Sequence, residues 1–108
     1  MNDNEKVYQS ALLISKDFGI SQSEFGIETE QKPDYTELLK KLTRVIKYLM
    51  DHDFQKLLNG FYRIDVDQSK VSQILEITNS DDIAFELAIL VLDRELQKVE
   101  SRLKYKDQ

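Results

Sequence analysis

Residues 34–50, DYTELLKKLTRVIKYLM, carry the clearest pattern in the chain. Asp34 can accept hydrogen bonds from the exposed N–H groups of a helix start, and Glu37 three residues later completes an aspartate version of the capping box. The apolar side chains that follow fall on one arc of about 140° when they are placed on a helix. They are Tyr35, Leu38, Leu39, Leu42, Val45, Ile46, Leu49 and Met50. The stretch therefore predicts an amphipathic helix from Tyr35 to about Met50.

Similar spacings predict further helices on both sides of this one. Val7, Ala11, Ile14 and Phe18 lie four, three and four residues apart, and Gly19 after them can adopt the left-handed conformation that ends a helix. Downstream, aspartate and asparagine residues supply candidate caps between apolar runs. The predicted helices besides Tyr35–Met50 are Asp3–Phe18, a segment from Phe54 to about Phe61 capped by Asp53, Gln68–Ile77 and Asp81–Tyr105.

Two five-residue stretches favour strands instead. Residues 25–29, FGIET, and residues 62–66, YRIDV, alternate apolar and polar side chains, and Asn59-Gly60 offers a place for the preceding helix to stop. We expect an all-α fold, an irregular bundle of four or five helices in a single domain spanning residues 1–108. The alternative is an α+β fold in which these two stretches pair as a small ribbon packed on the helices.

Composition excludes several classes of protein. The 108 residues include 15 basic and 20 acidic side chains, giving a formal charge of −5, and no cysteine. Disulfides, thiolate metal sites and thiol catalysis are therefore excluded, and the negative balance argues against general binding to nucleic acids or anionic membranes. The N-terminus lacks the pattern of a signal peptide, and no apolar run is long enough to span a bilayer. We expect an acidic, cytoplasmic protein.

The last predicted helix carries a narrow apolar seam formed by Leu92, Leu96, Val99 and Leu103. A helix of 25 residues is about 37 Å long, whereas a 108-residue domain has a radius of gyration of about 13 Å. The seam therefore either packs on the helix at 35–50 or meets a second chain. The second arrangement predicts a homodimer.

Residues 65–76 resemble the spacing of a calcium-binding loop. Asp65, Asp67 and Glu76 take its first, third and twelfth positions. However, Lys70 stands where the sharp turn needs glycine and puts a positive charge beside the ion, and Ser72 replaces an apolar residue. The favoured interpretation is that an aspartate caps a short helix.

Two other polar groups are candidates for chemistry. His52, between Asp51 and Asp53, is the single imidazole, but neighbouring residues on a helix point about 100° apart and rarely converge on one ion. Lys40, Lys41, Arg44 and Lys47 form a basic stripe that could meet phosphates, and it is also what an amphipathic helix presents to water.

No nucleophile signature, phosphate loop or dinucleotide fingerprint occurs in the chain. The sequence therefore predicts no catalytic residue, metal ion or cofactor, and a protein partner rather than a nucleic acid or a membrane. The predicted function is a non-catalytic interaction or structural module that acts through helix packing and self-association. The alternative is an ion-binding domain or small enzyme centred on His52 or on Asp65, Asp67 and Glu76.

Overall fold

The computed structural model describes residues 3–27, 31–77 and 79–106. Across these ranges it has six helices and no strand, and 84% of the residues are helical. The helices are α1 (Asp3–Phe18), α2 (Gln22–Phe25), α3 (Tyr35–His52), α4 (Phe54–Ile64), α5 (Gln68–Leu75) and α6 (Ser80–Lys106). The predicted all-α bundle is confirmed, with the single-turn α2 as an additional helix.

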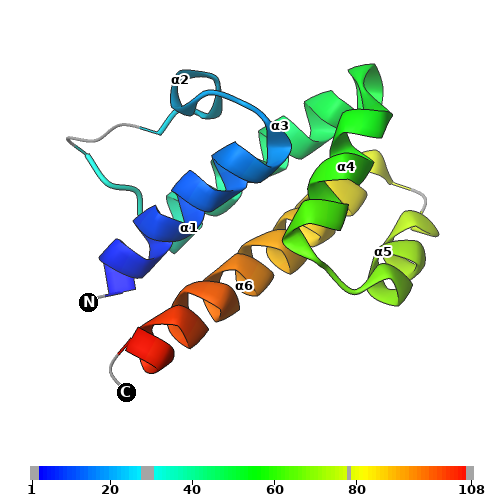
Figure 1. Cartoon of the computed structure of the whole chain (residues 1–108). Helices are drawn as coiled ribbons and strands as arrows, with labels where there is room; N and C mark the ends of the chain where they lie inside the picture. Colours follow the sequence, from blue (N-terminus) through cyan, green and yellow to red (C-terminus); the bar gives the residue numbers. More distant parts are fainter. Residues whose placement is uncertain (1–2, 28–30, 78, 107–108) are drawn as a thin grey trace.

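The long helix α6 is the centre of the bundle (Figure 1). Helices α1 and α3 pack along it, α4 crosses near its first half, and α5 contacts only α6 within the described part of the chain. Two polar contacts fix the antiparallel pairing of α3 with α6: Lys47 forms an ion pair with Asp81, and the Tyr35 hydroxyl donates to Asp93 over 2.9 Å. The short α2 packs against α1 and α3, away from α5.

Aspartate caps set the helix boundaries as the sequence predicts. A side-chain oxygen of Asp34 accepts from the Glu37 N–H at 2.8 Å, and one of Asp53 accepts from the Lys56 N–H at 3.1 Å. Asp53 also donates its own N–H to the Leu49 carbonyl at 2.8 Å. One residue thus ends α3 and begins α4, which keeps the two helices adjacent at a sharp corner.

The strand interpretation of residues 62–66 is wrong. Helix α4 continues through Gly60 to Ile64, because Leu57, Phe61 and Ile64 form one buried helical face. It ends at Asp65, which adopts a left-handed conformation with a φ of 65°. Within the other stretch, Phe25 belongs to α2, and residues 28–29 lie outside the described residues. The predicted ribbon is therefore not favoured.

The core is one hydrophobic cluster to which helices α1 to α6 all contribute, together with Ile27 and Val66 from the connecting segments. Its fully buried centre comes from α1, α3, α4 and α6, and includes Ile14, Leu38, Leu42, Ile46, Leu57, Leu87 and Val91. In α6 most of the run Ile83–Leu92 faces this cluster; Phe85 and Glu86 are exposed, and Ile89 lies outside the cluster. None of the helices in the described ranges is long and apolar enough to cross a membrane.

Candidate functional site: a cationic groove beside α3

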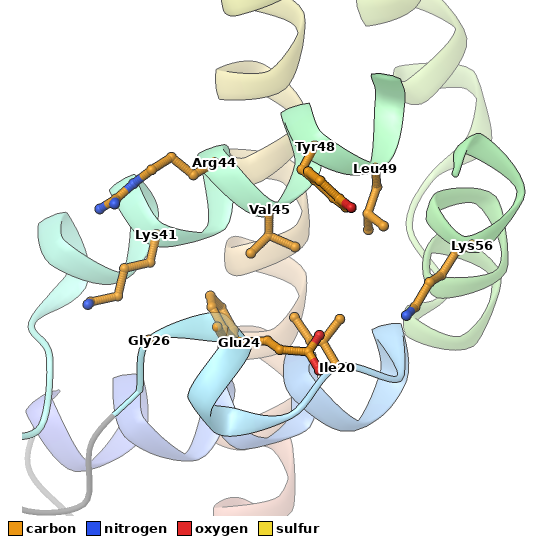
Figure 2. A pocket seen from close by; sticks show the side chains of 10 residues that line it. Ile20, Glu24, Gly26, Lys41, Arg44, Val45, Tyr48, Leu49 and Lys56 are labelled. Carbon is orange, nitrogen blue, oxygen red and sulfur yellow. The ribbon is translucent and has the colours of Figure 1, made fainter. Parts of the chain in front are cut away.

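A groove of about 520 Å³ lies between the α1–α2 corner and one side of α3, and α4 reaches its far end (Figure 2). Ligand sites in proteins commonly measure about 300–1,000 Å³. The size of this groove therefore suits a short peptide segment or a small amphipathic molecule. We call it the α2–α3 groove.

Local hydrogen bonds build the wall of the groove around α2. The Ser15 hydroxyl donates to the Ile20 carbonyl at 2.6 Å, and the Ser21 hydroxyl accepts from the Glu24 N–H at 3.0 Å. Gly26 then ends α2 in a left-handed conformation with a φ of 80°, which a residue with a Cβ adopts only at a cost. These contacts hold Ile20 and Phe25 opposite α3.

The other wall is one stripe of α3. Lys41, Arg44, Val45 and Tyr48 are spaced by three, four and seven residues from the first, so they lie on one side of the helix. Figure 2 shows Val45 and Leu49 reaching from α3 toward Ile20. Leu49 is buried, and Val45 is half-buried at the edge of the core. The α3 side of the middle of the groove is therefore apolar, and Glu24 lies opposite on α2.

Ile20, Phe25, Val45 and Leu49 form the apolar floor of the groove, and three cations stand at its two ends. Lys41 and Arg44 lie at one end and Lys56 of α4 at the other (Figure 2). Among the described residues, none of these three side chains forms a hydrogen bond or ion pair, whereas Lys47 on the same helix is paired with Asp81. Of the groove-lining residues that the structure describes, Glu24 is the one acid. The groove is therefore positive, although the chain as a whole is negative.

Tyr48 forms the rim of the groove and is 62% exposed. Its ring packs on the His52 ring with the centroids 4.4 Å apart and the planes tilted by 41°. An exposed aromatic ring with a hydroxyl group can cover an apolar ligand and donate one hydrogen bond to it. Together the lining offers apolar contact, positive charge and hydrogen-bond donors, which is the chemistry of binding an anionic and partly apolar ligand.

The predicted basic stripe is divided by the structure. Lys41 and Arg44 face the groove, Lys47 pairs with Asp81, and Lys40 is exposed outside it. Sequence analysis missed the contributions of Glu24 and Lys56, because both come from other helices. The one local signal was the spacing of Lys41, Arg44 and Tyr48 beside the apolar face.

The residues around His52 have separate structural contacts. His52 is exposed at the end of α3 and stacks on Tyr48, and Asp53 caps α4. In the ranges 3–27, 31–77 and 79–106, no group of three His, Asp or Glu side chains is arranged to hold a metal ion.

Residues 65–76 do not wrap around a common centre. Asp65 ends α4 and contacts Arg94, Asp67 caps α5, and Glu76 follows the end of α5. An oxygen of Asp67 accepts from the Ser69 hydroxyl at 2.7 Å and from the Ser69 N–H at 2.9 Å, and these bonds lower the pKa of its carboxyl group. Asp67 is thus used as a helix cap.

We expect millimolar calcium to leave the melting temperature of the protein unchanged. An ion that does not bind the folded state cannot stabilise it. Lys70, at the position where a calcium-binding loop turns sharply, instead lies within helix α5. Thermal melts followed by circular dichroism, with and without calcium, measure this. A rise of several degrees that Asp67→Ala abolishes would show that the segment binds calcium.

The predicted seam on α6 has intramolecular neighbours along much of its length. Leu92 and Val99 are buried within the single chain, and Leu96 is half-buried against the core. Leu103 is also half-buried. The structure therefore leaves the edge formed by Leu96 and Leu103 as the part of the seam that a second chain could still contact.

A buried charged cluster between α1, α4 and α6 was not predicted from the sequence. Glu95 is fully buried, and its Oε2 atom has no hydrogen-bond partner among the described residues. Lys98 lies 3.0 Å from Glu95 Oε1 and 3.9 Å from a carboxylate oxygen of Asp17, and it donates to the Ile64 carbonyl at 3.3 Å. The pKa of Glu95 is raised to about 7, chiefly by burial; Lys98 acts to lower it, and Asp17 acts to raise it.

Comparison of the chain with protein-family models, curated proteins and solved structures gives no match.

Proposed function

We propose that this chain is a non-catalytic interaction module, acting in the cytoplasm, that binds a segment of a partner protein in the α2–α3 groove. The observation that carries the proposal is the set of three cations around an apolar floor that have no partner among residues 3–27, 31–77 and 79–106. Charged side chains at a groove guide and orient a partner, while apolar contacts at its centre supply most of the binding energy. By contrast, Lys47 pairs with Asp81 and so connects two of the chain's own helices, α3 and α6.

A random peptide library displayed on phage tests this proposal directly. We expect enriched peptides to bind the wild-type protein and to lose binding to Arg44→Glu. Lys40→Glu is the matched control, because it makes the same change of charge on the same helix outside the groove. Equal melting temperatures for the two variants would show that both are folded. If the enriched peptides bind Arg44→Glu as well as wild type, or if no peptide is enriched, the proposal is wrong.

Self-association is a second candidate function. Phe54, Leu58 and Tyr62 form an apolar stripe on α4. Their exposed fractions are 42% for Phe54, 37% for Leu58 and 81% for Tyr62. Residues four apart share one side of a helix, so the stripe is continuous. Together with Leu96 and Leu103 on α6, it gives the chain two apolar surfaces on which a second copy could pack.

For self-association through the seam, we expect the wild-type protein to sediment as a dimer and Leu96→Glu to sediment as a folded monomer. A carboxylate buried without a partner is costly, and separating the chains relieves this cost. Ile83→Glu is the control, because Ile83 faces the core and its substitution should damage folding in any arrangement.

Two results would contradict the seam dimer. The first is a monomeric wild-type protein that Leu96→Glu destabilises by about 2–5 kcal/mol, the range for disrupting a core leucine. The second is a dimer that Leu58→Glu separates and Leu96→Glu does not, which would assign the interface to the α4 stripe.

A further inference from the structure

We propose that the occupant of the α2–α3 groove is an extended segment of another protein that carries an acidic residue on each side of an apolar side chain. This inference rests on the proposed function and specifies the partner. It follows from the order of groups along the groove: cations at one end, an apolar floor, and a cation at the other end (Figure 2).

The two ends of the groove set the spacing of the acids. Lys41 and Arg44 mark one end, and Leu49 lies beside the other end, which Lys56 closes. Along α3, the eight residues from Lys41 to Leu49 correspond to about 12 Å. An extended chain advances about 3.3 Å per residue. Two acids about four residues apart would therefore meet both cationic ends, with an apolar side chain between them over Val45.

Charge favours this partner over a nucleic acid. Uniform phosphate chains bind surfaces on which positive charge is continuous, but here Glu24 lies between the cationic ends and the rest of the chain is acidic. The apolar floor formed by Ile20, Phe25, Val45 and Leu49 would face a sugar–phosphate backbone without a matching group. An acidic peptide with a leucine or phenylalanine supplies both kinds of contact.

Four fluorescein-labelled peptides test the inference by fluorescence anisotropy. The first has an aspartate at each end of a glutamine–leucine–phenylalanine core, the second and third replace one aspartate by asparagine, and the fourth replaces both. We expect each aspartate to strengthen binding about two- to fivefold at low salt, and added sodium chloride to remove the difference. Replacing leucine and phenylalanine by serine should weaken binding about tenfold or more.

Charge-neutralising variants identify which end each aspartate meets. We expect Arg44→Gln to abolish the benefit of one aspartate and Lys56→Gln to abolish that of the other, whereas Lys40→Gln changes neither. Such coupling between one protein charge and one peptide charge is what a double-mutant cycle measures. The same peptides serve all variants, so differences in folding are detected as a loss of binding to every peptide, including the neutral one.

The outcomes separate this inference from the proposed function. Equal binding of all four peptides in the groove would overturn the inference and leave the proposed function intact. Failure of these peptides together with failure of the phage library would overturn both. Tighter groove binding of an oligothymidylate or of decanoate than of any peptide would also overturn the inference, because it would assign the groove to a nucleic acid or to a small amphipathic carboxylate.

Discussion

Replacing Glu95 by glutamine should make the protein more stable by about 2–3 kcal/mol at pH 8 and leave its stability unchanged near pH 4. Glu95 is fully buried, and burial raises its pKa from 4.5 to about 7. Above pH 7 the folded protein must therefore hold a buried carboxylate that Lys98 only partly compensates. A glutamine is neutral at every pH, so the buried site no longer has to hold a negative charge.

The direction of the pH dependence follows from the raised pKa. Between about pH 4.5 and pH 7, the folded state keeps a proton on Glu95 that the unfolded state has lost. The contribution of this proton to stability is fully present below pH 4.5 and is lost as the pH rises through 7. Lys98→Met removes the opposing cation, so it should raise the pKa of Glu95 and shift the loss of stability to higher pH.

Urea denaturation at several pH values between 4 and 8 measures this effect. Glu100→Gln is the matched control, because Glu100 is exposed on the same helix and its nearest cation, Lys6, is 4.0 Å away. We expect this control to change the free energy of unfolding by less than about 0.5 kcal/mol. A Glu95→Gln variant that is less stable than wild type at pH 8 would mean that the ion pair with Lys98 outweighs the cost of burial.

Gly60→Ala should destabilise the protein by about 2–3 kcal/mol, although alanine favours helices more than glycine does. A Cβ atom at position 60 would lie 2.2 Å from Cδ1 of Phe18. The Phe18 ring is buried between α1 and α4 and packs edge-on against Phe61, with the ring centroids 6.1 Å apart. The ring can therefore make room only by disturbing the core.

The same denaturation experiment distinguishes overpacking from other effects of the substitution. Asn59→Ala, at the neighbouring exposed position, should change stability by less than about 1 kcal/mol. Phe18→Leu combined with Gly60→Ala should recover part of the loss, because a smaller side chain leaves room for the new methyl group. If Gly60→Ala were as stable as wild type, the close packing of α1 on α4 would be wrong.

Residues 54–66 show how far local pattern determines this fold. The apolar positions Leu57, Phe61 and Ile64 fit a helix, while residues 62–66 fit a short strand equally well, and Gly60 favours a break. The ambiguity is resolved by a long-range contact, since Phe18 packs directly on Gly60. The long helices α1, α3 and α6 were predictable because their apolar faces extend over several turns. A single turn such as α2 is too short to show any period.

The binding groove depends even more on tertiary structure. Lys41 and Arg44 were predicted on one helix face, but the groove exists because α2 stands opposite them and Lys56 arrives from α4. Glu95 shows the same limit. Its spacing of three residues from Lys98 is typical of an exposed ion pair, and only the packing of α1 and α4 buries it.

The central claim, that the α2–α3 groove is the binding surface, is tested most directly by nuclear magnetic resonance. Adding the peptide with two aspartates to the ¹⁵N-labelled protein should shift the amide signals of residues 20–26, 41–49 and 56. Signals of the α4 stripe and of residues 96–103 should stay in place. Shifts confined to those other surfaces would contradict the assignment of the groove as the binding surface. The same holds if neither this peptide nor the phage-selected peptides shift any signal of the groove.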